Sequence, residues 1–245
     1  MANIPYENDF KDPMGPKGKT PWMTLNGEDF SDSQLCLELL ASTFGKDFNS
    51  HLTEAERAIG RAFQIMAEEH LYWVVVLWRW VYTKGKTLWA NAFIFFSGQC
   101  NRVVVLWRWV YTKGKTLWAI QMNFPAPLRF IMPIFVRRMK GQASAQGMGR
   151  HSQEEVIQEE VIEMGMKDLR AMSAYLGIKP YFMGDTPTEM DCAMFGMLAQ
   201  IVWCMQGSPF EQHMKGEFIN LKDFCERMKD QFWPDWNQCL LPPRV

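Results

Sequence analysis

The side chains best suited to metal or thiol chemistry are six cysteines and four histidines, and they are scattered along the chain. No two cysteines have the C-x-x-C spacing of a zinc or redox site, and no H-E-x-x-H sequence occurs. Glu68, Glu69 and His70 are adjacent, but neighbouring residues point to different faces of a helix, so a shared metal ion is a weak interpretation. His151, which follows Arg150, suits a loop better than the role of a catalytic base. We therefore predict no metal site, and buried, reduced thiols.

The pair Asp32 and Ser33 is a better candidate for binding, because it stands directly before a leucine-rich stretch that is expected to be helical. The free N–H groups at the start of a helix favour an anion. The same two side chains also suit the N-cap and the first turn, where they would serve the helix alone. The residue types therefore leave two interpretations, a small-molecule site and a helix cap.

Thr188 and Asp191 have the spacing of a capping box, in which each side chain binds the backbone N–H of the other residue. This arrangement satisfies two N–H groups and offers no chemistry. We therefore interpret this pair as structural, and loss of such an N-cap costs about 1 kcal/mol.

The unit that would position the Asp-Ser pair is a small α/β arrangement. Its predicted elements are an extended segment at 4–10, a loop rich in Gly, Pro and Lys at 11–20, and strands at 22–25 and 28–30. Asn26-Gly27 between the strands is the strongest short signal of a β-hairpin. A Ser31-x-x-Gln34 capping box then predicts a helix that runs to about Phe44.

The rest of the chain has the three- and four-residue spacing of apolar residues that indicates helices. The predicted helices begin after Thr53, which forms a capping box with Glu56, after Ser152, after Thr188, and at Asn220. One aromatic series follows the first of these starts, and it consists of Trp73, Trp78, Trp80, Tyr82 and Trp89. Such a series lines an apolar ligand pocket or, more often, fills a core.

Two duplications interrupt this pattern. The sequence VVVLWRWVYTKGKTLWA occupies residues 74–90 and again residues 103–119, and QEEVI occurs twice within 153–162. Solenoid repeats diverge in sequence and come in three or more copies, so an identical pair indicates a recent tandem duplication or an artefact of the gene model. Two identical tryptophan-rich segments cannot fill one place in a close-packed core. We therefore expect the first copy to be packed and the second to be displaced.

The composition excludes several classes of partner. The chain has 245 residues, 48% of them hydrophobic, and a net charge of -1, so nothing indicates binding to nucleic acid. The apolar runs at 71–77 and 88–100 fall short of the about 20 residues that a membrane span requires. Polar residues soon after Met1 do not match a signal peptide.

Several motifs together resemble a known family. GKTPWMTL at 18–25, with Ser-Asp-Ser at 31–33, resembles the glutathione-binding segment of glutathione-transferase-like proteins. YFMGDTPTEMD at 181–191 is similar to the signature of the helical domain in the same proteins. Three shorter sequences look like those of the failed axon connections and metaxin-like family in particular, namely EHLYW at 69–73, QGMGRH at 146–151 and WPDW at 233–236.

The resemblance implies an incomplete thioredoxin-like domain at 1–45 and an all-helical, glutathione-transferase C-terminal-like domain at 50–245. It implies glutathione as a ligand and no other cofactor. The residues that would hold this ligand are Thr20, Pro21, Trp22, Asp32 and Ser33. In the family the proline is cis and exposes the backbone of the residue before it. A trans proline that opens a strand is the alternative, since only about 5–6% of X-Pro bonds are cis.

The sequence departs from the family at its start. The family's first strand, whose end carries the Cys, Ser or Tyr that activates glutathione, has no counterpart before residue 4. We therefore expect a non-enzymatic, cytoplasmic protein with a cellular interaction role such as axon development. The alternatives are a detoxifying glutathione transferase in its full-length form and a metaxin-like component of import at the mitochondrial outer membrane. The resemblance also allows a homodimer and association with a membrane, and it indicates no particular protein partner.

Overall fold

The computed structural model describes residues 4–7, 22–78, 141–145, 147–148, 154–234 and 236. Of the predicted extended segment at 4–10, only residues 4–7 are described, and they form no strand. The predicted loop at 11–20 and the second copy of the long duplication lie outside the described residues. Of the first copy, residues 74–78 are described, and residues 74–77 are helical and buried.

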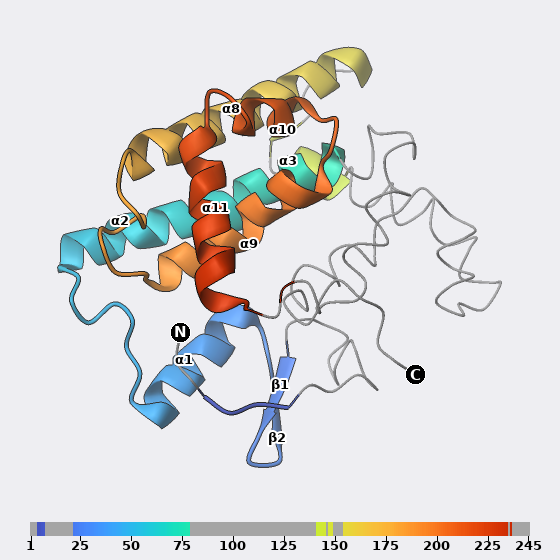
Figure 1. Ribbon diagram of the computed structural model, residues 1–245. Helices are drawn as coiled ribbons and strands as arrows, with labels where there is room; N and C mark the ends of the chain where they lie inside the picture. Colours follow the sequence, from blue (N-terminus) through green and yellow to red (C-terminus); the bar gives the residue numbers. More distant parts are fainter. Residues whose placement is uncertain are drawn as a thin grey trace.

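The N-terminal unit is a β-hairpin followed by one helix (Figure 1). Strands β1 (Trp22–Leu25) and β2 (Glu28–Ser31) pair antiparallel, with Trp22 opposite Ser31. Asn26 and Gly27 in the turn have φ angles of 53° and 86°. Positive φ at both central residues gives the two-residue turn whose twist matches that of the strands, which is why an Asn-Gly pair predicts this hairpin correctly.

Helix α1 (Ser33–Phe44) begins differently from the sequence prediction. Ser31 is the last residue of β2, and Asp32 is the N-cap, so the predicted Ser31-x-x-Gln34 capping box is wrong. Ser31 is paired with Trp22 in the hairpin, whereas the carboxylate of Asp32 accepts hydrogen bonds from the N–H groups of Gln34 and Leu35. The helix ends at Gly45, which takes the left-handed conformation common at helix C-termini.

The remaining described residues form a helical body. Its elements are α2 (Glu54–Ile65), η1 (Met66–Leu71), α3 (Tyr72–Leu77), α8 (Glu154–Leu176), α9 (Glu189–Cys204), α10 (Pro209–Met214) and α11 (Ile219–Phe232). Helix α9 contacts α2, η1, α3, α10 and α11, so it occupies the middle of the body, and α11 crosses its neighbours at a steep angle (Figure 1). The N-terminal unit lies beside one end of this body (Figure 1).

Two features of the helices differ from the sequence prediction. The helix expected from residue 53 onward contains a π-helical turn, η1, in which the N–H of Tyr72 donates to the carbonyl of Ala67. Helix α10 was not expected, although Ser208 caps it and Pro209 occupies its first turn, where a missing N–H costs nothing. The predicted starts of α2, α9 and α11 agree with the structure to within one residue, and the start predicted after Ser152 lies outside the described residues.

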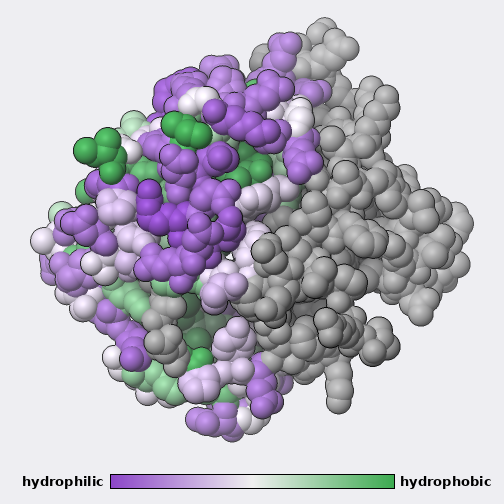
Figure 2. All heavy atoms as spheres, viewed as in Figure 1, coloured by the Kyte–Doolittle hydropathy of each residue, from purple (hydrophilic) through white to green (hydrophobic). Residues whose placement is uncertain are grey.

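The apolar core lies between the helices of the body. Its largest fully buried side chains include Phe182, Phe210, Phe218 and Phe224. Hydrophilic residues cover most of the described surface on the face shown in Figure 2. Within the described ranges, no helix combines the length and the apolar character that crossing a membrane requires.

Candidate functional site

Asp32 is the most unusual residue of the candidate site. Its φ of 88° and ψ of 126° lie in a region that residues other than glycine rarely adopt, at a cost of order 1–3 kcal/mol. Its Oδ1 atom accepts hydrogen bonds from the N–H of Gln34, at 3.0 Å, and of Leu35, at 3.3 Å. The strained backbone therefore fixes an exposed carboxylate at the start of α1.

The hairpin places two more predicted ligand residues near Asp32. Trp22 opens β1 and is paired with Ser31, so it lies at the end of the hairpin from which Asp32 follows. Ser33 is the first residue of α1, and both Trp22 and Ser33 are half-buried. Thr20 and Pro21 lie outside the described residues. The structure thus brings three of the five predicted ligand residues together.

Side chains of the helical body extend this site, and the sequence did not indicate them. Gln64 on α2 donates from Nε2 to Oε1 of Gln34, at 3.0 Å, and to Oε1 of Glu68, at 3.1 Å. Arg61 donates from Nη1 to Oε1 of Gln64, at 3.3 Å. A chain of amides therefore runs from the first turn of α1 to α2. No short motif joins residues 30 positions apart in the sequence, so only the fold shows this contact.

Thr188 and Asp191 form the capping box that their spacing predicts. Both residues are buried, and Oδ2 of Asp191 accepts bonds from the Thr188 N–H, at 2.8 Å, and hydroxyl, at 2.7 Å. Oδ1 of Asp191 accepts a further bond from the N–H of Phe182, at 2.8 Å. Burial raises the pKa of the Asp191 carboxyl, although these hydrogen bonds oppose the shift. All of these contacts stabilise the fold, which agrees with a structural role for the pair.

His70 pairs with a distant carboxylate and not with its sequence neighbours. Its Nδ1 atom lies 2.6 Å from Oδ2 of Asp168 on α8. Burial raises the pKa of Asp168, and the hydrogen bond with His70 opposes that shift. Among the described residues, no three His, Cys, Asp or Glu side chains are grouped so that they could hold a metal ion.

Two buried cysteines, one on α1 and one on α11, are not reactive. Burial raises the pKa of the Cys225 thiol well above its ordinary value, and burial is also the main cause of a raised pKa at Cys36. The thiolate is the reactive form of cysteine. Both side chains are therefore thiols at neutral pH.

The fold and the two halves of the chain define a class of protein. Residues 1–85 match the family model of the glutathione S-transferase N-terminal domain, and residues 165–228 match a glutathione S-transferase C-terminal domain model. The solved structure of the beta-etherase LigF from Sphingobium sp. strain SYK-6 superposes with a TM-score of 0.50 and 15% identity, over 88% of this chain and 76% of that one. The predicted fold class, glutathione-transferase-like with a small sheet and a helical domain, is confirmed.

Sequence similarity to individual proteins shows which glutathione-transferase-like proteins this chain resembles. Failed axon connections of Drosophila melanogaster is 31% identical over 91% of this chain, and metaxin-2 of Mus musculus is 29% identical over 47% of it. The chain belongs to the glutathione-transferase-like proteins of the failed axon connections and metaxin group, as the motifs predicted. It spans 48% of the length of failed axon connections and 42% of the length of metaxin-2. The isoprene-epoxide glutathione S-transferase of Rhodococcus sp. strain AD45 is 28% identical over 89% of this chain and 79% of its own length.

Proposed function

We propose that this protein binds a glutathione-like ligand at the start of α1 without transferring it, and that it acts in the cell as an interaction protein. Its role would be of the kind that failed axon connections has, in axon development or a similar cytoplasmic task. The observation that carries the proposal is the strained, exposed carboxylate of Asp32.

The geometry of Asp32 suits an amino acid headgroup. Because Oδ1 is held by two backbone N–H groups, the orientation of the carboxylate is fixed before a ligand arrives. A pre-organised group loses less conformational entropy on binding, which favours affinity. The ammonium group of a γ-glutamyl moiety would pair with this carboxylate, and its carboxylate would meet Ser33 at the start of the helix, where N–H groups favour anions.

The lack of turnover rests on the groups around this carboxylate. Transfer requires a group that stabilises the thiolate of glutathione, because the thiolate is the nucleophile. The described side chains that hydrogen-bond next to Asp32 are the amides and carboxylates of Gln34, Glu38, Gln64 and Glu68, together with Arg61. Cys36 in the same helix is a buried thiol with a raised pKa. Apart from Ser33, which we assign to the ligand's carboxylate, none of these groups is a hydroxyl or thiolate suited to activating a thiol.

A glutathione transferase is the second candidate function. It is favoured by the likeness to the isoprene-epoxide glutathione S-transferase, which extends over most of both chains. In that case the exposed Tyr6, in the described N-terminal segment, is the hydroxyl to test as the activating group. A metaxin-like role in protein import, with association at a membrane, is a further alternative, and the likeness to metaxin-2 covers less than half of this chain.

Calorimetry and a conjugation assay test the proposal together. Glutathione binding by the natural protein should weaken about tenfold or more in Asp32→Asn, which keeps a capping oxygen but loses the charge that pairs with the ligand's ammonium group. Asp29→Asn is the matched control, because Asp29 is an exposed carboxylate on the adjacent strand. Conjugation of glutathione to a generic electrophile should proceed at the uncatalysed rate. Turnover above that rate that Tyr6→Phe abolishes would favour the transferase instead.

A further inference from the structure

The N-terminal unit of β1, β2 and α1 shares no apolar core with the helical body in the described part of the chain. The buried apolar cluster contains residues from Ala67 to Met228 and none from this unit, and Cys36, the buried residue of α1, stands outside it. Contacts between domains that are small and polar allow the domains to move relative to each other. The polar contacts between the N-terminal unit and the helical body are therefore the contacts to consider for a motion of this unit.

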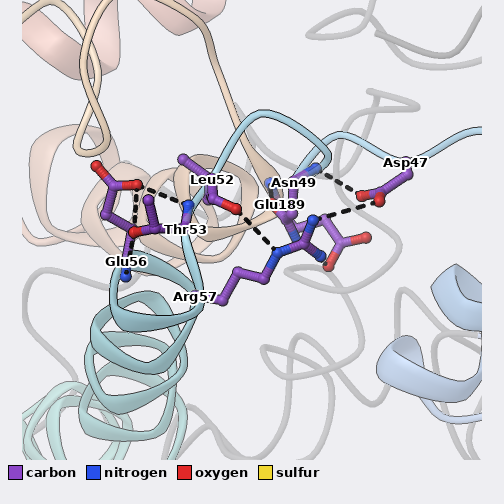
Figure 3. Close-up of polar contacts among 7 residues, drawn as sticks. All are labelled: Asp47, Asn49, Leu52, Thr53, Glu56, Arg57 and Glu189. Carbon is purple, nitrogen blue, oxygen red and sulfur yellow. Dashed lines mark hydrogen bonds and ion pairs between the residues drawn. The ribbon is translucent and has the colours of Figure 1, made fainter.

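The linker between the two bodies is anchored to the helical body (Figure 3). Asn49 donates from Nδ2 to Oε2 of Glu189, at 2.9 Å, and its Oδ1 accepts from the N–H of Glu189, at 3.4 Å. Arg57 on α2 pairs with Asp47, at 3.6 Å, and donates from Nε to the carbonyl of Leu52, at 3.3 Å. The linker from Asp47 onward is thus held at the starts of both α2 and α9.

The backbone just before this anchored stretch has open space beside Gly45, and backbone hydrogen bonds to Ala41 tie it to the end of α1. Gly45 has a φ of 61° and a ψ of 36°, and nothing lies within 4 Å of the position that a Cβ atom would take there. The next residue, Lys46, is exposed, and its N–H donates to the carbonyl of Ala41 at 2.9 Å, inside α1. A change in the dihedral angles at Gly45 and Lys46 would break this bond to Ala41 and rotate α1 against a stationary linker.

The contact between Gln64 and Gln34 lies at the opposite end of α1. Gln34 is in the first turn of α1, and the bond from Gln64 at 3.0 Å is partly buried. It is a neutral hydrogen bond between two side chains, one from each body. A neutral hydrogen bond shifts an equilibrium by about two- to tenfold, so it can open readily and still favour the position of α1 against α2.

We propose that Gly45 and Lys46 form a hinge and that the Gln34–Gln64 hydrogen bond is the latch that holds the N-terminal unit against α2. When the latch opens, α1 swings about the hinge and carries Asp32 away from Gln64, while Asn49 keeps the linker on the helical body. This motion of the unit does not depend on the proposed ligand.

Limited proteolysis and hydrogen exchange test this inference on the full chain. Lys46 is exposed, but cleavage after it by trypsin requires its N–H to leave the Ala41 carbonyl, so the rate of cleavage tracks the population of the open hinge when opening and closing are fast. Gln64→Ala should raise both the rate of that cut and the exchange of residues 43–49 by about two- to tenfold, the change that one neutral hydrogen bond supplies. Gln34→Ala should have the same effect, and the double variant should add nothing. Gln212→Ala, an exposed glutamine on α10, is the control and should change neither.

Two results would overturn the inference. If Gln64→Ala and Gln34→Ala leave cleavage after Lys46 and exchange at 43–49 unchanged, the bond is not a latch. If Gln64→Ala instead raises exchange along the whole of α2 and lowers the melting temperature, the side chain supports that helix and does not gate a hinge. A faster cut with an unchanged melting temperature supports the hinge.

Discussion

At the scale of single residues, Asp191 joins two segments of the backbone through one side chain. One buried carboxylate accepts bonds from the N–H groups of Phe182 and Thr188 and from the hydroxyl of Thr188. A buried N–H that loses its partner costs about 1–3 kcal/mol. Asp191→Ala should therefore lower the free energy of unfolding by roughly 2–5 kcal/mol, measured by chemical denaturation.

Two variants make that measurement specific. Asp191→Asn keeps one acceptor oxygen and should lose less stability than Asp191→Ala. Asp185→Ala removes an exposed carboxylate six positions earlier and should stay within about 0.5 kcal/mol of the natural protein. Equal losses at Asp185 and Asp191 would contradict the role assigned to the buried carboxylate.

Glu56 should make the stability of the fold depend on pH, and the sign of this dependence can be predicted. Its carboxylate accepts hydrogen bonds from the N–H and the hydroxyl of Thr53, both at 2.8 Å, and the backbone bond is the main cause of its lowered pKa. A carboxyl whose folded pKa lies below its unfolded pKa stabilises the fold above the unfolded value, and this stabilisation is lost as the pH falls through the folded value. The natural protein should therefore lose more of its pH 7 stability in acid than Glu56→Gln loses.

Denaturation curves measured from pH 7 down to about pH 3 check this expectation, since Glu ordinarily titrates near 4.3. The loss of stability over this range should be smaller in Glu56→Gln, which does not titrate. Glu54→Gln is the control, because Glu54 lies in the same turn and no side-chain bond to Thr53 involves it. An identical pH profile for Glu56→Gln and the natural protein would count against the capping box as the cause.

At the scale of elements, one close helix contact lies where α8 meets α3 and α10. A Cβ atom on Gly165 would lie 2.5 Å from Cγ1 of Val74 and 2.7 Å from Cε1 of Phe210. Overpacking of this kind costs about 1–3 kcal/mol, so Gly165→Ala should destabilise the protein by that amount. Gly196 in α9 has nothing within 4 Å of the same position, and Gly196→Ala should stabilise by about 0.4–1 kcal/mol.

Thermal and chemical unfolding of the two variants check that Gly165→Ala lowers the stability and Gly196→Ala raises it. If Gly165→Ala is as stable as Gly196→Ala, then α8 does not approach Val74 and Phe210 as closely as described.

Elements with a local cause were predicted well from the sequence. The Asn26-Gly27 turn and the box of Thr53 and Glu56 depend on residues within four positions of each other, so their motifs contain the whole reason for the structure. The start of α1 was misplaced because two capping side chains, Ser31 and Asp32, are adjacent and only strand pairing decides between them. The π turn of η1 has no sequence signal, because it depends on how one long helix packs against several others.

At the scale of the whole molecule, the candidate site was predicted only on its N-terminal side. Trp22, Asp32 and Ser33 lie within one short stretch of sequence, whereas Gln64 reaches Gln34 only through the fold. The bond between Asn49 and Glu189, which anchors the linker, likewise joins distant parts of the chain. The partnership of His70 with Asp168 was missed for the same reason.

The long duplication leads to a prediction about the whole chain. The described start of its first copy, Val74 to Leu77, is buried in the core. Because a second identical segment cannot occupy the same place, deletion of residues 91–119 should raise the melting temperature and the solubility of the protein. Deletion of residues 74–102 leaves the same sequence. A lower melting temperature and lower solubility after the deletion would show that the duplicated segment is part of the fold.

The π turn between α2 and α3 gives this molecule a tolerance to changes in chain length. A π turn is an α-helical turn that has accommodated one additional residue, so the helices on either side keep the orientation they would have without it. Loss of one codon in η1, for example that of the exposed Glu69, would leave the residues of an uninterrupted α-helix from Glu54 to Leu77, with Gln64 and Val74 on their present faces. A similar loss within α9 or α11 would rotate everything beyond it by about 100° and move its buried side chains out of the core. The gene can therefore shorten by one codon in η1 at little cost to the fold, and η1 is the described helical segment in which such variants are expected to survive.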